Sequence, residues 1–359
     1  MQAFPQRLKA ARLMAGLSLR KLADRLEGQL SYQAINKYEK GELSPSSSVL
    51  IALAKALSVD IDYFMRPTEA SRALEQVDYR RVKSKLGKRA QLALEQSVMD
   101  ALERYDKLER IMGDVGEKHY FNYKATVRQE EDALRAADAL RQEWNLGYDP
   151  IPDVVKMLED KGYKILIIAA PEGFDGMKAD WGDDKVIVLP EARTRDSDKV
   201  RIRFTALHEL AHLGLTFSDD LEEKEVEQLC HVFASAVLYP SAMALRELRS
   251  HRDRFFLQEW ILIKERWGIS LSALAKRANQ LDIISDYRYR QINIQFRQRG
   301  WHRPDQEPGT YTSKELPTRQ ERLLLQGLAM DLLSLQEAAH LGHLSPLTLR
   351  EKIRQPLCE

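Results

Sequence analysis

Hydrophobic residues in the first 66 positions recur at helical spacing, and short polar breaks separate the runs. Ser18 and Ser31 stand directly before such runs, where a capping hydroxyl is favoured, and Gly41 stands where a glycine commonly ends a helix. The pattern predicts an all-α domain of five short helices with no strand. The predicted helices begin near Leu8, Leu19, Tyr32, Pro45 and Asp60.

The next stretch, residues 67–145, is mainly helical in pattern and strongly charged. Apolar residues fall on one helical face between Gln91 and Arg110, which predicts a long amphipathic helix. No combination of residues there suggests chemistry, so we interpret 67–129 as a helical connector.

The pattern changes between residues 146 and 245, where short β-branched runs alternate with turn residues. Strands are predicted at 163–169 and 185–189, with a third considered at 178–181. Helices are predicted from Pro152 to Leu158, over 199–215 and over 222–238. A small sheet followed by helices indicates an α+β unit. We place its core at 130–245 and a helical extension at 246–300.

The last part of the chain, 301–359, begins with a segment rich in proline and polar residues at 301–316, which we expect to be a linker. Helical spacing returns over 320–353, with a break between Gly342 and Pro346. The chain is therefore predicted to be multidomain and mainly α, as its length of 359 residues also suggests.

One segment combines two histidines and a glutamate at a spacing that suits a metal site. His208 and His212 are four positions apart. On a helix they would share one face at about 5–6 Å, a separation that suits two imidazoles on a tetrahedral Zn²⁺. Glu209 would then act as general base toward a water whose pKa the metal lowers to about 7. The alternative is a pair of helix-surface histidines with no metal.

A catalytic zinc with two histidines needs a third protein ligand. Glu227 is the leading candidate, because the residues at i+3 and i+7 from it, Cys230 and Ala234, are small enough to pack against the first helix. His231 is considered as a further ligand, a residue supporting the ligands, a substrate contact or an ordinary polar residue. The remaining candidates are Asp219, Asp220, Glu222, Glu223 and Glu225.

The stretches 203–215 and 226–240 resemble the ImmA/IrrE family of metallopeptidases, in a likeness that covers residues 130–300. The resemblance implies a zincin-like peptidase domain, a Zn²⁺ cofactor and, as substrate, a helix-turn-helix repressor. Cys230-His231 replaces the family's usual Ala-Asn pair, so we expect the substrate groove to differ. By this resemblance the site residues are His208, His212 and Glu227 as zinc ligands and Glu209 as general base.

Residues 5–66 resemble the Xre/Cro-type helix-turn-helix domain, in motifs such as Leu17-Ser18 and Tyr38-Glu39-Lys40-Gly41. By position, the helix after Ser31 would be the recognition helix, which enters the major groove of DNA. The alternative is a domain of this type that serves only for dimerisation or docking. The predicted DNA contacts are Arg20, Lys21, Tyr32, Gln33, Asn36 and Lys37.

Charge supports DNA binding locally rather than over the whole chain. Residues 1–66 carry ten Lys or Arg and six Asp or Glu, a net charge of +4, whereas the whole chain has +1. The local excess suits contacts with phosphates. A second group of cations is either a further DNA-binding element or part of a helical cap on the peptidase. It consists of Arg288, Arg290, Arg297, Arg299 and Arg303.

The two cysteines, Cys230 and Cys358, are too few and too far apart to suggest a disulfide framework. No apolar run approaches the roughly 20 residues needed to span a bilayer. The N-terminus also lacks the apolar region of a signal peptide. We therefore expect a cytoplasmic protein without a membrane anchor.

Three functions compete on the sequence. The first is a DNA-binding regulatory zinc metallopeptidase that cuts a repressor or itself, and the second is a transcriptional regulator with a non-catalytic metal site. The third is an antitoxin-like protein that regulates its own operon. Glu209 favours the first, because a structural zinc site has four protein ligands and no need for a base. The expected partners are operator DNA through residues 1–66, a protein substrate, and a second copy in a homodimer.

Overall fold

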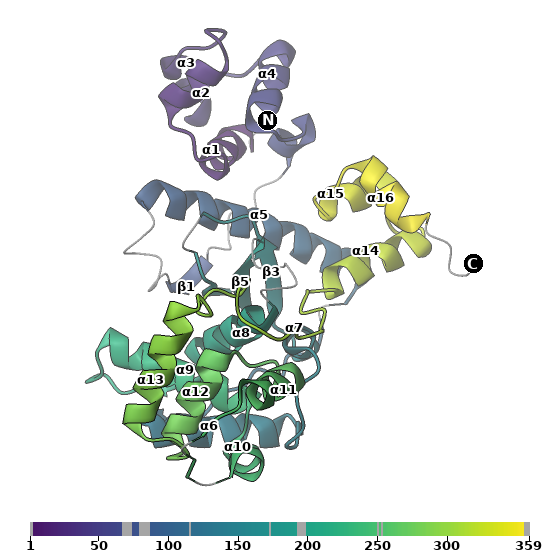
Figure 1. Cartoon of the computed structure of the whole chain (residues 1–359). Coiled ribbons are helices and arrows are strands. Elements are labelled where there is room, and N and C mark those ends of the chain that lie inside the picture. The colour runs from purple at the N-terminus through teal and green to yellow at the C-terminus, as the bar shows by residue number, and fades with distance from the viewer. Residues whose placement is uncertain are drawn as a thin grey trace.

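The computed structural model describes residues 3–66, 74–78, 87–114, 116–171, 174–191, 199–249, 251–252 and 254–354. The protein has a helical N-terminal domain, a mixed α+β domain and a helical C-terminal region, which confirms the predicted multidomain, mainly α fold (Figure 1). The long helix α5 (Lys88–Met112) lies between the N-terminal domain and the α+β domain.

The N-terminal domain consists of α1 (Phe4–Met14), α2 (Leu19–Arg25), α3 (Tyr32–Glu39), α4 (Ser47–Leu57) and the 3-10 helix η1 (Ile61–Met65). Ser18 and Ser31 cap α2 and α3 as predicted, because each hydroxyl accepts a hydrogen bond from the backbone N–H three residues on. Ser46, rather than the predicted Ser44-Pro45 start, caps α4. The fully buried core of this domain includes Leu8, Leu22, Ile35, Leu53 and Phe64.

A four-stranded sheet forms the centre of the α+β domain, in the order β1-β4-β5-β3. Its strands are β1 (Leu74–Asp78), β3 (Lys164–Ile168), β4 (Met177–Trp181) and β5 (Asp184–Pro190). β3 runs parallel to β5, while β4 is antiparallel to both β5 and β1. The strand considered at 178–181 is therefore present. β1 lies in the segment interpreted as a helical connector, so that interpretation missed a strand.

Helices cover both faces of this sheet, because successive side chains of a strand point to opposite faces. Leu166 and Ile168 pack in one core with α5, whereas Ile165 packs in another core with α8 (Lys199–Gly214). Three C-terminal helices join the α5 side: α14 (Arg319–Ala329), α15 (Leu335–Leu341) and α16 (Pro346–Ile353). The helical run predicted over 320–353 thus has a second break, after Ala329.

The α8 side of the sheet is extended by further helices. α9 (Glu223–Leu238) packs against both α8 and α6 (Glu130–Glu143), and α7 (Val154–Asp160) packs against α8 and β3. Two short strands, β2 (Thr126–Val127) and β6 (Thr216–Phe217), pair in parallel beside them. A separate core, centred on Trp260 and Trp267, holds together the helical extension. Its helices are α10 (Ser241–Leu248), α11 (Leu257–Trp267), α12 (Leu271–Gln280) and α13 (Asp286–Gln298).

The segment 301–316, expected as a linker, is instead fixed to the α+β domain. Glu315 is completely buried and forms an ion pair with Arg203 of α8, which is also completely buried. The Glu315 carboxylate also accepts hydrogen bonds from the first N–H groups of α7, at Val154 (3.0 Å) and Val155 (3.1 Å). The prediction was wrong because a buried glutamate is satisfied here by partners more than a hundred residues away.

The N-terminal domain packs directly on α5. α1 packs along α5, and Arg7 donates a hydrogen bond to Glu103 at 2.6 Å. At the end of the domain, the Arg66 guanidinium lies 2.8 Å from Nδ1 of His340 in α15. These contacts join the N-terminal domain, α5 and the C-terminal helices.

Among the described helices, none alone has the length and apolar character of a membrane span, and α9 with α10 passes that test only as a bent pair.

Candidate metal centre

The centre of the candidate site is α8, which lies in the middle of the α+β domain. Leu207, Leu210 and Ala211 are fully buried and fix the helix against the sheet and α9. The intervening His208 and Glu209 are buried as well, at 5% and 8% exposure. A charged or polar side chain buried to this extent requires a polar partner or a metal ion.

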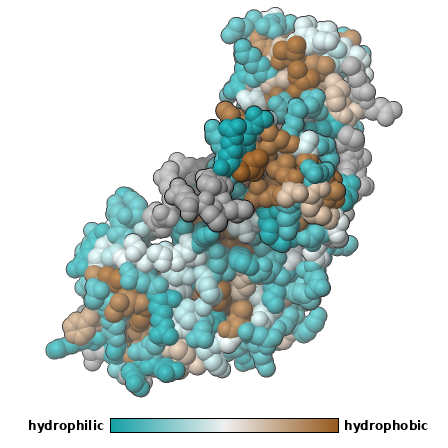
Figure 2. Space-filling view, turned by 90° about the vertical axis from the view of Figure 1, so that its right-hand side faces the viewer, coloured by the Kyte–Doolittle hydropathy of each residue, from teal (hydrophilic) through white to brown (hydrophobic). Residues whose placement is uncertain are grey.

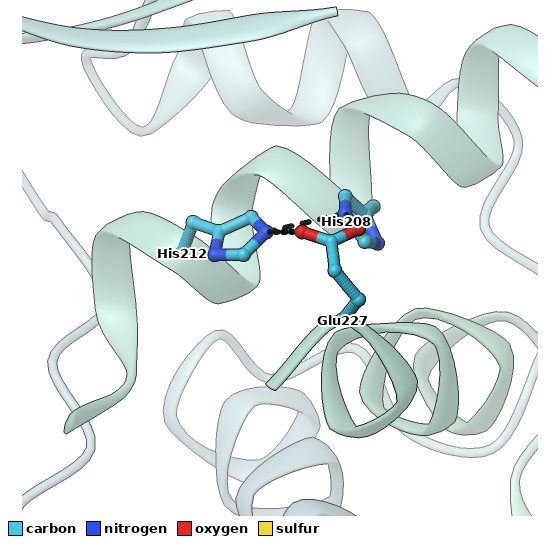
Figure 3. Close-up of side chains that lie close together, drawn as sticks. All are labelled: His208, His212 and Glu227. Atoms are coloured by element: carbon cyan, nitrogen blue, oxygen red, sulfur yellow. Dashed lines mark hydrogen bonds and ion pairs between the residues drawn. The ribbon is translucent and has the colours of Figure 1, made fainter. Parts of the chain in front are cut away.

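Three side chains from two helices converge at this site. His208 and His212 extend from one face of α8, and Glu227 extends toward them from the first turns of α9 (Figure 3). Nε2 of His208 lies 3.2 Å from Nε2 of His212. The two oxygens of Glu227 lie 3.1 Å from Nε2 of His212 and 3.3 Å from Nε2 of His208. The structure thus brings together the three residues that the sequence suggested as ligands.

These distances fit a tetrahedral Zn²⁺ ion. Ligand atoms at the usual ~2.0–2.1 Å from zinc are separated from each other by about 3.3 Å in a tetrahedron. Two imidazole nitrogens facing each other can share only one proton, so a cation between them satisfies both lone pairs. One carboxylate and two imidazoles are also among the donor sets found at catalytic zinc sites, which keep a position open for water.

The charge state of Glu227 suits a ligand. Burial opposes its ionisation, but hydrogen bonds to His208 and His212 and attraction to them outweigh burial, and they lower the pKa of this carboxyl below its ordinary value. Metal ligands must be deprotonated. Glu227 is therefore available as a carboxylate at neutral pH.

Two further side chains from α9 lie next to the ligands. Sγ of Cys230 is 3.6 Å from Nδ1 of His212, the nitrogen that does not face Glu227. The ring of His231 lies 4.7 Å from that of His208, centroid to centroid, but its nitrogens are not part of the converging set. His231 therefore lies in position to support the ligands. The contact from the Cys230 thiol to a ligand was not predicted, since that residue was considered only for its small size.

Glu209 lies where the backbone before β4 approaches α8. A Cβ atom placed on Gly176 would lie 2.7 Å from the methyl group of Thr205 and 3.0 Å from a carboxylate oxygen of Glu209. Any side chain at position 176 would therefore clash with Thr205 and press against the carboxylate of the proposed base. Nothing in the sequence pattern showed which side chain this glycine would contact.

The predicted DNA contacts are on the surface of the N-terminal domain. Arg20, Lys21, Tyr32, Gln33 and Lys37 are exposed, and Asn36 is half-buried. The guanidinium of Arg20 lies 5.4 Å from the centre of the Tyr32 ring, which links the start of α2 to the start of α3. Behind them, Arg12 donates two hydrogen bonds to Glu39, at 2.6 and 2.8 Å, and holds α3 against α1. Sequence reasoning missed this pair.

The arginines considered as a second DNA-binding element belong to the helical extension and the segment after it. Arg290, Arg297, Arg299 and Arg303 are exposed, and Arg288 is half-buried. α13 packs on α12 around Ile292 and Phe296. Contact between these arginines and DNA stays a prediction.

Comparison with known families agrees with this division of the chain. Residues 8–64 match a family described as Helix-turn-helix, and residues 171–279 match a metallopeptidase family described as IrrE N-terminal-like domain. No curated protein matches the chain. The two matches confirm the resemblance inferred from the sequence, a helix-turn-helix domain followed by a domain of the ImmA/IrrE kind. The helices from α13 to α16 lie outside both matched ranges.

Proposed function

We propose that this chain is a DNA-binding regulatory zinc metallopeptidase that cleaves a peptide bond within a protein substrate. The observation that carries the proposal is the convergence of His208, His212 and Glu227 directly beside Glu209, in a domain that follows a helix-turn-helix domain. We further infer that the substrate is a helix-turn-helix repressor and that the enzyme acts as a homodimer in the cytoplasm.

Each residue has a defined part in the proposed hydrolysis. His208, His212 and Glu227 would hold Zn²⁺. When bound, zinc supplies Lewis acidity, which polarises the scissile carbonyl and lowers the pKa of water to about 7. Glu209 accepts the proton of the attacking water and passes it to the departing amine nitrogen. Gly176 leaves room for the Glu209 carboxylate, and Cys230 and His231 keep the two ligand imidazoles in place.

DNA binding would bring the peptidase close to a repressor that is bound to DNA. A repressor occupies its operator, so an enzyme bound to neighbouring DNA encounters it at a raised effective concentration. The docking of the N-terminal domain on α5 supports this, because it fixes the distance between the recognition helix α3 and the metal centre. Dimerisation would match the paired half-sites that such domains commonly read.

The decisive experiment compares the wild-type chain with Glu209→Gln, both loaded with zinc. The probes are dye-quenched casein, as a generic unfolded substrate, and the mass of the chain itself, which reports self-cleavage. Loss of a general base lowers the rate by roughly 10²–10⁴-fold. Bound zinc should stay the same in Glu209→Gln, because Glu209 is not one of the proposed ligands.

The matched control is Glu223→Gln, an exposed glutamate in the first turn of α9. It should leave both the rate and the zinc content unchanged. Zinc-loaded wild type that cleaves neither probe would contradict the peptidase and support a transcriptional regulator with a non-catalytic metal site. Equal rates for wild type and Glu209→Gln would remove Glu209 from the reaction.

A further inference from the structure

The C-terminal helices α15 and α16 repeat the local design of the helix-turn-helix pair α2 and α3. Ser334 caps α15 and Ser345 caps α16, as Ser18 and Ser31 cap α2 and α3. All four serine hydroxyls accept a hydrogen bond from the N–H three residues on, at 3.0–3.2 Å. Serines also cap α12 and α13, at Ser270 and Ser285, but those helices are longer, with 10 and 13 residues. By contrast, α15 and α16 have 7 and 8 residues, the same lengths as α2 and α3.

The turns between the helices also correspond. Each contains a non-glycine residue in the left-handed region, Glu27 with φ 50° and His343 with φ 53°. In each, a partly buried leucine, Leu30 or Leu344, directly precedes the serine cap of the second helix. The second turn is shorter by two residues, since the capping serines are 13 positions apart in one pair and 11 in the other.

The buried positions match as well. Leu22 of α2 and Ala338 of α15 occupy the fourth position after their caps, and both are fully buried. Ile35 of α3 and Leu349 of α16 also occupy the fourth position, with 0% and 2% exposure. The first helix of each pair thus packs inward and positions the second, which is the arrangement of a helix-turn-helix element.

The second helix of the C-terminal pair is exposed to solvent. Apart from Leu349, every residue from Pro346 to Arg354 is exposed, and Leu347 reaches 67%. Figure 2 views the side of the molecule that carries these helices, where hydrophobic surface adjoins hydrophilic surface. The residues from Pro346 to Arg354 include three cations, Arg350, Lys352 and Arg354, against one acid, Glu351. Lys352 forms an ion pair with Glu321 of α14 at 2.7 Å, which leaves the two arginines as the cations available to a ligand. α16 is therefore locally basic although the chain as a whole is close to neutral.

From these correspondences we propose that α15 and α16 form a second DNA-binding element, which contacts duplex DNA through α16. Leu347 stands at the second position after its cap, as the predicted base contact Gln33 does in α3, and an apolar side chain there suits a thymine methyl group. Arg350 matches Asn36 in position and can contact guanine or a phosphate. Gln336, exposed at the start of α15, matches Arg20 and suits a phosphate.

The placement of this element allows it to act together with the N-terminal domain. α15 contacts α5, on which the N-terminal domain also packs, and His340 of α15 meets Arg66 at the end of that domain. Two DNA-binding elements held on one helix would contact one DNA molecule at a fixed separation. Such a bidentate attachment raises affinity through effective concentration without stronger individual contacts.

The test measures binding of the full chain to a mixed-sequence DNA duplex of about 30 base pairs, about three helical turns. The background carries Gln33→Ala, Asn36→Ala and Lys37→Ala, which removes the contacts of α3. Into this background we introduce Arg350→Ala with Arg354→Ala. The matched control pair is Arg135→Ala with Lys156→Ala, which removes two exposed cations from α6 and α7.

The α16 pair should weaken the residual binding about fivefold or more. It should also lower the slope of log affinity against log salt by about 0.9 for each of the two arginines that contacts a phosphate. The control pair should leave both values unchanged. A result for the α16 pair equal to that of the control overturns the proposal.

A second outcome would also overturn it and would identify a different role for this surface. If Leu347→Ser shifts the sedimentation coefficient of the chain while DNA binding is unchanged, α16 docks a second copy of the protein rather than DNA. Neither measurement depends on hydrolysis, so the proposal and the proposed peptidase activity can fail separately.

Discussion

Two clusters of buried charged side chains lie on opposite sides of the central sheet, and they are satisfied in different ways. The lysine cluster, on the α5 side, consists of Lys164, Asp106, Glu109 and Asp184. The metal cluster, on the α8 side, consists of His208, His212 and Glu227. Both contain groups that are costly to remove from water. In the lysine cluster, protein cations inside the cluster and around it offset that cost.

In the lysine cluster, protein cations compensate the charges of the buried carboxylates. The Lys164 ammonium contacts all three carboxylates, at 2.8 Å from Glu109 and 2.9 Å from Asp184, with a short contact to Asp106. Two further cations, Arg319 and Lys118, bind Glu109 and Asp184 from outside. Burial opposes the charge on Lys164, but the carboxylates outweigh it and raise the pKa of the ammonium above its usual range. Each carboxylate of the cluster thus contacts at least one protein cation, although Arg319 is shared with Asp114 at 3.2 Å.

The metal cluster consists instead of donor atoms that face one another. Its three donors, two imidazoles and one carboxylate, face each other at 3.1–3.3 Å. Nδ1 of His208 is buried and has no hydrogen-bond partner among the described residues. Burial and charge alone therefore do not indicate function. What distinguishes the metal cluster is a set of donor atoms directed at one point.

The largest effect should come from removing one donor from the metal cluster. His212→Ala should lower the affinity for Zn²⁺ by more than the roughly 10–100-fold that follows loss of a residue merely supporting a ligand. Metal content after dialysis, measured by inductively coupled plasma mass spectrometry, reports the change. His302→Ala, which removes an exposed histidine outside the site, is the matched control and should retain near-stoichiometric zinc. If the wild-type protein takes up no zinc, the metal cluster does not bind this metal, and the proposed difference between the two clusters is wrong.

A smaller but global effect is expected from the lysine cluster. Lys164→Met should leave three buried carboxylates with too little positive charge, a change that typically costs roughly 3–5 kcal/mol. The free energy of unfolding in urea measures it. Lys185→Met, which removes the partly exposed partner of Asp180, should cost at most about 1 kcal/mol. If the two variants unfold alike, the lysine cluster does not stabilise the fold. Zinc content of the folded protein should be unchanged in both.

The sequence predicted the metal cluster far better than the lysine cluster, for a physical reason. His208, Glu209 and His212 are neighbours on one helix, so their spacing alone predicts their arrangement. Lys164 depends on Asp106, which is 58 positions away on another element. In the sequence it appears only as a lysine at the start of an apolar run. Its burial becomes visible when β3 is placed against α5.

The same limit applies to the parts of the fold that the sequence missed. Caps such as Ser18 and Ser31 are local signals, and both are where they were predicted. β1 was missed because its partner β4 is about a hundred residues further on, where Leu74 pairs with Trp181. Glu315 was placed in a linker because its neighbours are polar, whereas the group that buries it is Arg203. Charges or strands that pair across long distances in the sequence leave little signal in the local pattern of hydrophobic and polar residues.

The contact between the N-terminal domain and α15 provides a third example of a titratable side chain that is held by protein partners. His340 accepts a hydrogen bond from Arg66 at 2.8 Å, so it resembles the lysine cluster in being satisfied by protein alone. Burial, together with the nearby charges of Arg66, Arg104 and Lys107, lowers the pKa of His340 to about 4, against the smaller opposing effect of Asp60. The imidazole is therefore neutral in the folded protein well below neutral pH.

The sign of the pH effect follows from this lowered pKa. An unfolded chain protonates His340 near its ordinary pKa of about 6.5, whereas the folded chain resists protonation down to about 4. The stabilising contribution is fully present above pH 6.5 and is lost as the pH falls toward 4. Because His340 is only half-buried, we expect about 1 kcal/mol of this loss between pH 7 and pH 5.

The measurement is the free energy of unfolding at pH 7 and pH 5 for wild type and for His340→Gln. Glutamine can still accept from Arg66 through its amide oxygen but does not titrate, so this variant should lose about 1 kcal/mol less than wild type between the two pH values. The matched control, His302→Gln, replaces an exposed histidine and should follow wild type. Identical pH dependence in all three proteins would show that the Arg66–His340 contact does not hold a neutral imidazole, and that docking of the DNA-binding domain depends on α1 and α5 alone.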